Sequence, residues 1–413
     1  MDSRNGTCRF CDKPLKHTFV DLGSSPLANS YLKAEQLFEA EPFYPLHVYV
    51  CESCLLVQLP VFETPENIFT DYAYFSSHSE SWLQHARDYS QLMIERFGID
   101  ETKRVIEVAS NDGYLLRHFR ERGIPVLGID PARNVADAAE RLGIPTIVKF
   151  FGVETARELV RDDVYADLLI ANNVLAHVPA LNDFVKGMKI ILRKDGVITL
   201  EFPHLMRLIE ENQFDTIYHE HFSYFSFHAV CRIFAAHGFT IFDVEELPTH
   251  GGSLRVYARH DSNNSLPVDR RVAELISREE RAGHTALPTY MSFAEKVKET
   301  KRQILKFFVQ AKHDRKTIVA YGAPAKGNTL LNYCGIRTDF IDYTVDRSPH
   351  KQGLFLPGTR IPVCRPEKIF ESEPDYVVIL PWNLKDEIME QMAAIGRWGG
   401  RFVTLIPEVR ISS

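Results

Sequence analysis

The sequence predicts an α/β protein with two doubly wound, Rossmann-like domains behind a small cysteine-bearing N-terminal module. Apolar strand segments alternate with helical segments in two separate stretches of the chain, which is typical of parallel sheets covered by helices. Two CxxC pairs precede both stretches. A chain of 413 residues also exceeds one ordinary hydrophobic core. We therefore expect three units, at residues 1–70, 71–262 and 263–413.

Composition and charge narrow the class of protein. A net charge of −7 argues against a general nucleic-acid-binding surface, which needs excess Lys and Arg. The sequence has no apolar run long enough for a membrane helix, and its first residues lack the apolar stretch of a signal peptide. Seven cysteines are too few, and odd in number, for a secreted disulfide framework. We expect a cytoplasmic protein, with a monomer as the default state and neither nucleic acid nor membrane as partner.

The cysteine pairs indicate a structural zinc site. A two-residue gap lets both sulfurs of a pair turn toward one point, and four thiolates complete a tetrahedral Zn²⁺ site with no open position. The candidate ligands are Cys8, Cys11, Cys51 and Cys54. The thirty-nine residues between the pairs exceed usual zinc-ribbon spacing, so this loop must carry strands of its own, at 18–22 and 45–50. The alternatives are four incidental thiols or a redox pair.

The first α/β stretch contains a small-residue turn after its first strand. Strands are expected near 104–108, 126–130, 166–173 and 196–202. The turn after the first strand resembles motif I of the S-adenosyl-L-methionine (SAM)-dependent methyltransferases, usually E-x-G-x-G-x-G. The matching residues are Glu107, Ala109, Ser110, Asn111 and Gly113, so Ala and Asn replace the first two glycines. An NAD-type domain is the alternative, although a dinucleotide loop reads GxGxxG.

Three further positions support a methyl-donor site at the carboxyl ends of these strands. Asp130 closes the second strand, with Pro131 beside it, and a carboxylate there can accept hydrogen bonds from both ribose hydroxyls. Asn172 and Asn173 end the third strand, where methyltransferases of this class hold the methionine part of SAM. We expect SAM to be the cofactor.

The second α/β stretch follows charged helical segments at 266–315. Strands are expected near 317–321, 343–346 and 376–380, and the first leads into the turn 322–327. This turn is not a Walker A loop, but its small residues, the following helix N-terminus and Lys326 suit an anionic pyrophosphate. The alternative is that Lys326 is a solvated surface residue.

The densest cluster of acid/base groups is Tyr218-His219-Glu220-His221, within an aromatic run. Desolvation by aromatic rings favours neutral imidazole, whereas a nearby carboxylate favours the charged form. A histidine between those influences can exchange a proton near neutral pH. Adjacent residues of a strand alternate faces, so His219 and His221 are expected to share a face while Glu220 points away.

The order of these four motifs resembles the three-domain sugar C-methyltransferases that act on nucleotide-linked 4-keto-deoxysugars, most closely the dTDP-sugar C-3′ type. The resemblance implies a central SAM domain, with the nucleotide-linked deoxysugar held between it and the flanking domains. It also implies roles for Tyr72 and His177 beside Tyr218, Glu220 and His221. The glycine-containing loop has a family counterpart too, which implies substrate contacts from His250, Gly251, Ser253 and Arg255.

Such a reaction requires a base at the carbon next to the ketone and a donor at the ketone oxygen. We expect His221 to be the base, with Glu220 orienting or charging an imidazole nearby. Tyr218, Tyr72 or His177 would stabilise the enolate oxygen. His177 as a core residue and Tyr72 as packing remain open. The alternative functions are O- or N-methylation of a sugar, an NAD-dependent nucleotide-sugar dehydrogenase or epimerase, and a non-enzymatic zinc-bearing adaptor.

Overall fold

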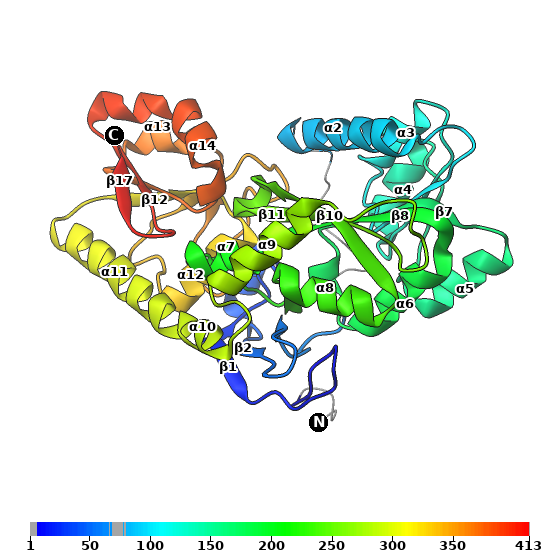
Figure 1. Cartoon of the computed structure of the whole chain (residues 1–413). Coiled ribbons are helices and arrows are strands. Elements are labelled where there is room, and N and C mark those ends of the chain that lie inside the picture. The colour runs from blue at the N-terminus through cyan, green and yellow to red at the C-terminus, as the bar shows by residue number, and fades with distance from the viewer. Residues whose placement is uncertain (1–5, 66, 68–76, 78–79, 413) are drawn as a thin grey trace.

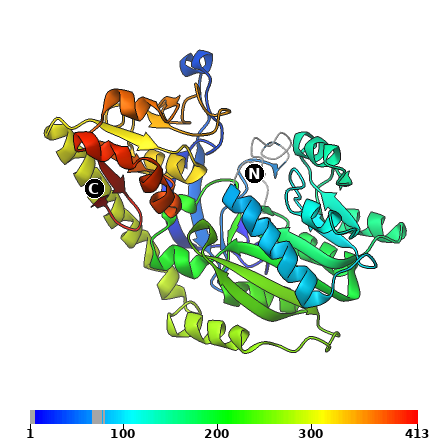
Figure 2. The ribbon, with the colours of Figure 1, turned by 90° about the horizontal axis from the view of Figure 1, so that it is seen from above.

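A computed structural model describes residues 6–65, 67, 77 and 80–412. It contains three sheets, of four, seven and six strands. Figures 1 and 2 show the seven-stranded and six-stranded sheets on opposite sides of the molecule, with the N-terminal strands between them. The sequence prediction of two Rossmann-like units and an N-terminal module is confirmed.

The last strand of the N-terminal sheet comes from the middle of the chain. Its order is β1-β2-β3-β9 and all of its pairings are antiparallel. The elements are β1 (His17–Ser25), the 3₁₀ helix η2 (Ala34–Phe38), β2 (Tyr44–Val50), β3 (Val57–Gln58) and β9 (Ser223–Tyr224). The strands expected at 18–22 and 45–50 are β1 and β2. The pairing of β3 with β9 was not predicted, because two residues are too short for a strand pattern to be visible.

The seven-stranded sheet has the order β10-β11-β8-β7-β4-β5-β6. The strands β8 to β6 are parallel, whereas β11 is antiparallel to both β8 and β10. The expected sheet was wholly parallel; the long antiparallel pair β10–β11 corrects that. The strands are β4 (Val105–Val108), β5 (Val126–Ile129), β6 (Thr146–Ile147), β7 (Ala166–Asn172), β8 (Leu192–Pro203), β10 (Phe239–Leu247) and β11 (Ser253–His260).

Helices cover both faces of this sheet. They are α2 (Glu80–Phe97), α3 (Leu116–Arg120), α4 (Arg133–Arg141), α5 (Val153–Arg161), α6 (Leu181–Ile191), α7 (Leu205–Glu210) and α8 (Phe227–Ala236), with the 3₁₀ helices η4 (Leu175–His177), η5 (Phe214–Thr216) and η6 (Thr249–Gly251). Ser226 caps α8, where its side chain accepts the backbone N–H of Ala229. In Figure 1, α2 lies on the opposite side of the sheet from α8.

The C-terminal sheet is parallel apart from its last strand, with the order β14-β13-β12-β15-β16-β17. The helix α9 (Arg270–Arg281) packs against β10 and α8 of the seven-stranded sheet's domain. The elements that follow it are α10 (Leu287–Met291), α11 (Phe293–His313), β12 (Ile318–Tyr321), α12 (Ala325–Cys334), β13 (Thr344–Val345), β14 (Val363–Cys364), α13 (Lys368–Ser372), β15 (Tyr376–Ile379), η7 (Trp382–Leu384), α14 (Lys385–Gln391), η8 (Ala393–Trp398), β16 (Arg401–Thr404) and β17 (Arg410–Ser412). The helical segment expected at 266–315 is present as α9 to α11. None of the helices in the described part of the chain could span a membrane.

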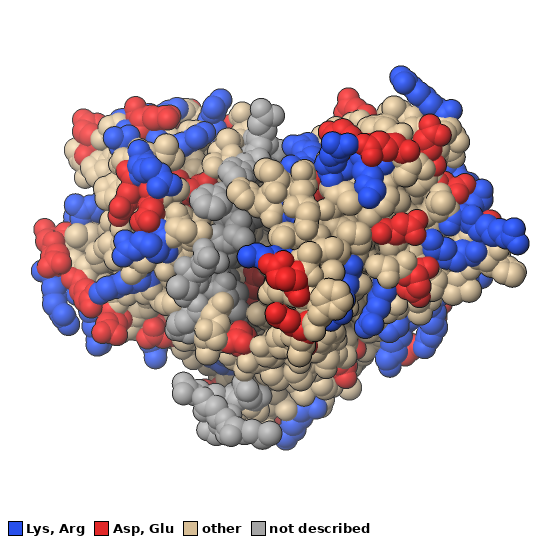
Figure 3. Space-filling view, turned by 180° about the vertical axis from the view of Figure 1, so that it is seen from behind, with Lys and Arg blue, Asp and Glu red and all other residues tan. Residues whose placement is uncertain are grey.

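The hydrophobic cores do not follow the divisions of the sequence. One core joins Phe19 and Val48 of the N-terminal sheet to Phe308 of α11 and Ile318 of β12. A second core joins the cysteine pairs and Leu56 to the helices and strands of the domain built on the seven-stranded sheet. The N-terminal module therefore packs its sheet against the C-terminal half and its cysteine end against the domain of the seven-stranded sheet. On the face shown in Figure 3, side chains of both charges are interspersed among uncharged residues.

Candidate active site

The four cysteines predicted to bind zinc form one compact cluster. Their sulfur atoms lie within 4.8 Å of one another, with Cys8 Sγ 3.4 Å from Cys54 Sγ and Cys11 Sγ 3.5 Å from Cys51 Sγ. Tetrahedral Zn–S bonds of about 2.3 Å place sulfurs about 3.8 Å apart, so this donor set fits Zn²⁺. All four positions are protein ligands. The chain therefore holds a closed, structural zinc site.

The two CxxC pairs are followed by the same backbone turn. The residue after each pair, Asp12 or Leu55, has a left-handed φ of 58° or 60° and donates its N–H to the carbonyl of the first cysteine, at 2.9 Å. Left-handed backbone at a non-glycine residue is uncommon, and here it turns both sulfurs of a pair inward. Gln58 of β3 also donates its side-chain N–H to Cys8 Sγ at 3.2 Å. A hydrogen bond of this kind orients a metal-binding thiolate.

The turn after β4 has the backbone of a glycine-rich loop without its glycines. Ala109, Asn111 and Gly113 have φ values of 54°, 50° and 76°, all left-handed. The two non-glycine departures from the expected motif therefore occupy the conformations that glycine normally supplies. The close approach on the other side of the turn comes from Gly128 of β5, where a Cβ atom would lie 2.4 Å from Ser110 Oγ. The turn therefore has the backbone shape of a glycine-rich loop although Ala109 and Asn111 are not glycines.

The carboxyl ends of β4, β5 and β7 leave buried polar atoms facing this turn. Asp130 accepts the N–H of Asn111 and that of Ala132, each at 2.9 Å, and each oxygen keeps a second lone pair. Burial, with the nearby charge of Asp112, raises its pKa. Glu107 Oε2, Asn172 Oδ1 and Ser110 Oγ have no hydrogen-bond partner within the described residues. Unpaired buried polar atoms are costly, and hydroxyl and amino groups of SAM would satisfy them. The residues present fit the cofactor.

The other two cofactor candidates flank these atoms. Asn173 has a φ of 57° and donates its N–H to the carbonyl of Glu201 at 2.7 Å, which fixes the end of β7. Pro131 is partly exposed beside Asp130. Desolvation raises the pKa of Glu107 well above its usual range, and the charges of Asp130 and Asp112 add to the shift. These surroundings therefore disfavour the charged form of Glu107.

The acid/base cluster is a tight turn, which corrects the expectation of a strand. His221 donates its N–H to the carbonyl of Tyr218 at 2.9 Å, and the two rings lie with centroids 4.1 Å apart. The chain turns here because Thr216 ends η5 and β9 begins at Ser223, so six residues must reverse direction. In a strand, side chains two residues apart point to the same face, but in a turn they do not. His219 and His221 consequently do not share a face.

His221 points into the interior beside His177. Its Nδ1–H donates to the carbonyl of Thr216 at 3.0 Å, which leaves Nε2 with the lone pair. The His177 and His221 rings are 4.8 Å apart and nearly perpendicular. Desolvation lowers the pKa of His221 well below its usual value, and the charges of His177, His250 and Lys326 lower it further. A cavity of about 20 Å³, enough for one water molecule, adjoins His221.

Glu220 and His219 face the N-terminal module instead. Glu220 Oε1 accepts a hydrogen bond of 2.6 Å from Asn29, and desolvation raises the pKa of Glu220 to about 7. His219 packs edge-on against Tyr44, and its Nε2–H donates to the carbonyl of Pro45 at 3.3 Å. Neither side chain hydrogen-bonds to His221 in the described contacts. The expected partner of an imidazole, Glu220, is replaced by the Thr216 carbonyl.

His177 lies beside the turn, at the end of η4. Desolvation lowers its pKa to about 4, partly offset by a hydrogen bond to the backbone of Glu220. The backbone of η4 and the turn are joined, because Phe222 donates its N–H to the carbonyl of Ala176 at 2.7 Å. His177 is therefore held neutral next to His221. Tyr72 lies outside the described residues.

Lys326 reaches the same place from the C-terminal domain. Its Nζ donates to Asn383 Oδ1 at 2.7 Å and lies 4.5 Å from the centre of the Trp382 ring. Burial lowers its pKa, and Asp215 opposes that shift. Trp382 in turn donates its indole N–H to Asp215 Oδ2 at 2.7 Å. Lys326 is therefore held among protein groups near the histidines, and the alternative of a freely solvated lysine is wrong.

The glycine loop between β10 and β11 is held on both sides. His250, Gly251 and Gly252 have φ values of 56°, 88° and 114°. A Cβ at Gly251 would overlap Trp382, and one at Gly252 would overlap Arg207. Ser253 donates its hydroxyl to the carbonyl of Thr249 at 2.9 Å. The ring of His250 lies 5.3 Å from that of Trp82, and desolvation of the imidazole together with the charge of Lys326 lowers its pKa.

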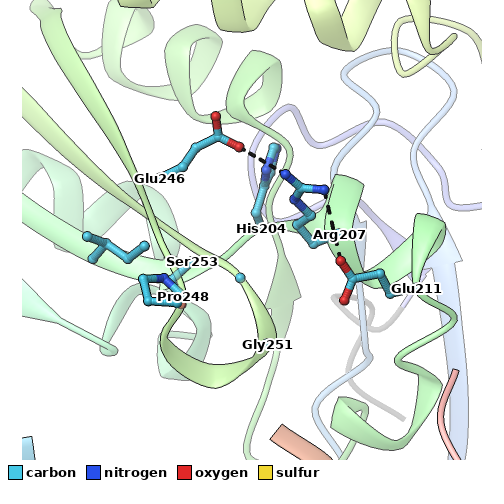
Figure 4. A pocket seen from close by; sticks show the side chains of 9 residues that line it. His204, Arg207, Glu211, Glu246, Pro248, Gly251 and Ser253 are labelled. Carbon is cyan, nitrogen blue, oxygen red and sulfur yellow. Dashed lines mark hydrogen bonds and ion pairs between the residues drawn. The ribbon is translucent and has the colours of Figure 1, made fainter.

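An open pocket of about 470 Å³ lies behind this loop. Figure 4 shows Arg207 between Glu246 and Glu211, with His204 and Gly251 nearby. These ion pairs are exposed and are worth little individually. The acid/base cluster does not line this pocket, whereas the predicted substrate contacts Gly251 and Ser253 do.

Arg255 is the predicted substrate contact that the structure places differently. Its guanidinium pairs with Glu201 at 2.6 Å and with Glu245 at 3.1 Å, and it lies over the ring of Tyr89. Arg255 is buried within the sheet, where these carboxylates satisfy its charge. It therefore braces β8, β10 and β11 from within the fold.

Sequence reasoning missed several residues around the cluster. They are Asn29, His85, Glu201, Asp215, Thr216 and Trp382. Most are single polar or aromatic residues far along the chain from their partners, so no local pattern marks them. Glu201 alone had a signal, because it is a charged residue near the end of an apolar strand.

Comparison with known proteins agrees with this architecture. Residues 8–69 match a zinc binding domain, residues 81–244 a methyltransferase domain, and residues 248–407 a C-methyltransferase C-terminal domain. The chain is 37% identical over 406 residues to the C-methyltransferase NovU of Streptomyces niveus, covering 98% of this chain and 96% of that protein. This protein belongs to the C-methyltransferase family. It is a SAM-dependent enzyme with a structural zinc site.

Solved structures of methyltransferases resemble the central domain only distantly. The magnesium protoporphyrin IX methyltransferase of Synechocystis PCC 6803 with bound SAM is 14% identical, with a TM-score of 0.33, covering 43% of this chain and 78% of that one. The 1,6-didemethyltoxoflavin-N1-methyltransferase of Burkholderia thailandensis is 19% identical, with a TM-score of 0.34, covering 45% and 83%.

Proposed function

We propose that the protein methylates C3 of a nucleotide-linked 4-keto-deoxyhexose, with dTDP as the nucleotide and His221 as the base. One observation carries the proposal. The Thr216 carbonyl holds the Nδ1 proton of His221, so that Nε2 is a neutral lone pair within a desolvated cluster. A base that abstracts a weakly acidic C–H proton must be unprotonated at neutral pH and shielded from water.

The ketone makes that proton acidic enough to remove. Abstraction by His221 Nε2 leaves the electron pair of the broken C–H bond delocalised onto the ketone oxygen as an enolate. The neighbouring groups able to stabilise this oxygen are Tyr218 and His177, with Tyr72 as the third candidate. The positive charge of Lys326 lies near the same histidines and favours the enolate as well.

The methyl-donor side is formed by the ends of β4, β5 and β7. Asp130 would hold the ribose hydroxyls of SAM, and Glu107 and Asn172 would satisfy its remaining polar groups. SAM would supply an electrophilic methyl group and leave as S-adenosylhomocysteine when its S–CH3 bond breaks. The enolate carbon would take this methyl, the ketone would re-form, and the proton on His221 would pass to water. Ala109, Asn111 and Gly113 keep the turn close enough for that approach.

The C-terminal domain would hold the nucleotide. The turn after β12, with Lys326 at the start of α12, lies near the catalytic histidines through Asp215 and Trp382. His250, Gly251 and Ser253 on the glycine loop lie between this turn and the methyltransferase sheet, and they would contact the sugar.

O- or N-methylation of the same sugar is the nearest rival, since it needs no carbanion. Incubation with dTDP-4-keto-6-deoxyglucose in deuterium oxide, with S-adenosylhomocysteine in place of the donor, separates the two reactions. We expect deuterium to enter at C3. Absence of exchange, together with a new methyl group on oxygen or nitrogen by NMR, would contradict C-methylation.

His221→Asn tests the base. General-base catalysis contributes about 10² to 10⁴-fold, so we expect kcat to fall by about 10³-fold with an unchanged Kd for SAM by calorimetry. His219→Asn is the matched control, because His219 packs on the N-terminal module and should keep activity within about threefold. Near-normal turnover of His221→Asn would remove His221 from the base role.

The pH profile gives a second test of the same residue. The surroundings lower the pKa of His221, so it loses its proton below the usual histidine range. The rate should therefore be independent of His221 protonation above about pH 6.5, the ordinary histidine pKa, and fall only as the pH drops through the lowered pKa. Glu220→Gln serves as the control, because the pKa of Glu220 is raised to about 7. An acid limb above pH 6.5 that persists in Glu220→Gln would contradict a neutral His221.

A further inference from the structure

A half-buried histidine pairs with a buried carboxylate at the end of β8, and this pair has no part in the proposed base chemistry. His85 of α2 places its Nε2 2.8 Å from Glu201 Oε2. Glu201 is fully buried, and both bonds from Arg255 go to its other oxygen, Oε1, at 2.7 and 2.6 Å. Arg255 therefore already balances the Glu201 charge. His85 is additional to what the burial of Glu201 requires.

The pair lies where the methyl-donor site meets the acid/base cluster. Glu201 is the register partner of Asn172 on the adjacent parallel strand, so both side chains leave the same face of the sheet. Asn172 Oδ1 is one of the buried atoms without a partner among the described residues. Tyr89 of α2 bonds to Thr199 on that face, which shows that α2 covers it. Figure 2 shows α2 lying along this sheet.

An aromatic stack extends from His85 toward the glycine loop. The ring of Trp82 lies parallel to that of His85, with centroids 4.9 Å apart at 18°, and 5.3 Å from that of His250. On the other side Trp82 lies 6.3 Å from Tyr114, which directly follows Gly113 of the cofactor turn. His85 is thus fixed by a stack and a carboxylate, between the turn that fits the cofactor and the loop that faces the histidines.

The carboxylate decides which ring nitrogen is available. Glu201 accepts from Nε2, and its own pKa is lowered by His85 and Arg255 against the opposing effect of burial, so it is ionised. An ionised carboxylate only accepts hydrogen bonds, so the imidazole tautomer that pairs with Glu201 carries its proton on Nε2. Nδ1 is then a hydrogen-bond acceptor. A hydroxyl or amino group is the complementary donor.

We propose that His85, oriented by Glu201, is a specificity-determining residue whose Nδ1 accepts a hydrogen bond from the hydroxyl or amino substituent on the carbon that is methylated. This inference rests on the proposed function. The contact would fix the orientation of the sugar between the proposed base and the methyl donor. Glu201 acts through His85 and is a positioning residue.

Two substitutions separate the two nitrogens of His85. The amide nitrogen of His85→Gln reaches the position of Nε2, keeps the bond to Glu201 and removes the Nδ1 acceptor. His85→Asn places an amide oxygen near Nδ1 and gives up Glu201. The probes are dTDP-4-keto-6-deoxyglucose, its 3-amino analogue and its 3-deoxy analogue, with kcat and KM measured separately, and the Kd of SAM and the melting temperature measured for each protein.

We expect His85→Gln to keep the melting temperature and the Kd of SAM, and to lose about 10- to 100-fold in kcat/KM on the 3-hydroxy or 3-amino sugar, the cost of one lost hydrogen bond to a buried partner. His85→Asn should retain more of this activity than His85→Gln. On the 3-deoxy sugar, wild type and His85→Gln should be equal, because the contact is already absent.

Three results would overturn the inference. The first is a His85→Gln enzyme as active as wild type on sugars that wild type methylates. The second is an equal loss in both variants with a lower melting temperature, which would show that His85 only holds α2 in place. The third is an undiminished difference between wild type and His85→Gln on the 3-deoxy sugar. If wild type methylates none of the three sugars, the proposed function itself fails and the inference fails with it.

Discussion

The two Rossmann-like sheets of this protein use one local design at their first turns. In the methyltransferase sheet, Asp130 at the end of the second strand accepts the N–H of Asn111 in the turn after the first strand, at 2.9 Å. In the C-terminal sheet, Asp346 accepts the N–H of Ala323 in the corresponding turn, at 2.8 Å. Each aspartate also accepts an N–H from two residues further along. The acid braces the turn in both.

The space above the two turns differs. Around Asp130, Glu107 and Asn172 keep buried atoms without partners within the described chain. Around Asp346, Lys351 donates its Nζ to the carbonyl of Ala323 at 2.8 Å, and the hydroxyl of Tyr31 from the N-terminal module donates to the same carbonyl. The first turn leaves room and unsatisfied groups for a ligand. The second is already contacted by the chain itself.

The comparison teaches that an acid at the end of the second strand does not by itself mark a nucleotide site. Its first function is to accept backbone N–H groups of the turn, and ligand binding depends on what else approaches. In the C-terminal sheet, the N-terminal module makes that approach. We therefore expect the substrate to contact the C-terminal domain at Lys326, on the side that faces Asp215, rather than at Asp346.

Removal of zinc should have the largest effect and should separate the two sheets. The cysteine end of the module holds β3 in place, and the N-terminal sheet shares its core with α11 and β12. Zinc sites contribute folding free energy outright, so chelation should lower the melting temperature by about 10 °C or more and abolish turnover. The Kd of SAM, measured on the chelated protein by calorimetry, should change by less than about threefold.

Cys51→Ser should reproduce this result, and Cys364→Ser, at an isolated cysteine of β14, is its control. A zinc-free protein that keeps its melting temperature, or that loses SAM binding in parallel with stability, would show that the two sheets do not respond separately.

Matched substitutions of the two aspartates come next. Asp130→Asn and Asp346→Asn each replace an acceptor of a backbone N–H by an amide, and each should cost about 1–3 kcal/mol of stability. Only Asp130→Asn should also weaken SAM binding, by about 10- to 100-fold, because it loses the ribose contact as well. Thermal unfolding and calorimetry measure both quantities. Equal effects of the two variants on the Kd of SAM would break the comparison.

The smallest effect is expected from Tyr31→Phe. This change removes one hydrogen bond to the carbonyl of Ala323 and leaves the packing of the ring, so it should cost about 1 kcal/mol. Tyr49→Phe, on the neighbouring strand β2, is the control, because its hydroxyl makes only a long contact of 3.4 Å with His47. A Tyr31→Phe protein as stable as wild type would show that the module is held by its apolar core alone.

Much of this organisation follows from local sequence patterns, and the rest depends on distant contacts. The cysteine spacing predicted the metal cluster, and alternating apolar segments predicted both sheets. Ala109 and Asn111 weakened the cofactor motif, because a sequence motif does not record that both have the left-handed backbone that glycines usually supply. The turn at Tyr218 was taken for a strand because its aromatic residues suit either conformation.

Individual site residues could be predicted only where the residue type itself indicates the chemistry, as two neighbouring histidines indicate proton transfer. His221 and His177 do lie together, and the chain holds both neutral. Arg255 was misjudged because an arginine near a glycine loop reads the same whether it meets a ligand or an internal carboxylate. The partner of His221 was misjudged because a backbone carbonyl, Thr216, has no signature in sequence.

The pairing of β3 with β9 joins the zinc site to His221, the proposed base, along a very short path. Val57 of β3 is three residues from Cys54, and its partner Tyr224 is three residues from His221. A newly made chain that has not yet acquired its metal would therefore be able to take up the methyl donor while its base remains unplaced. On the proposed function, a chain without zinc would bind SAM without being able to deprotonate the sugar.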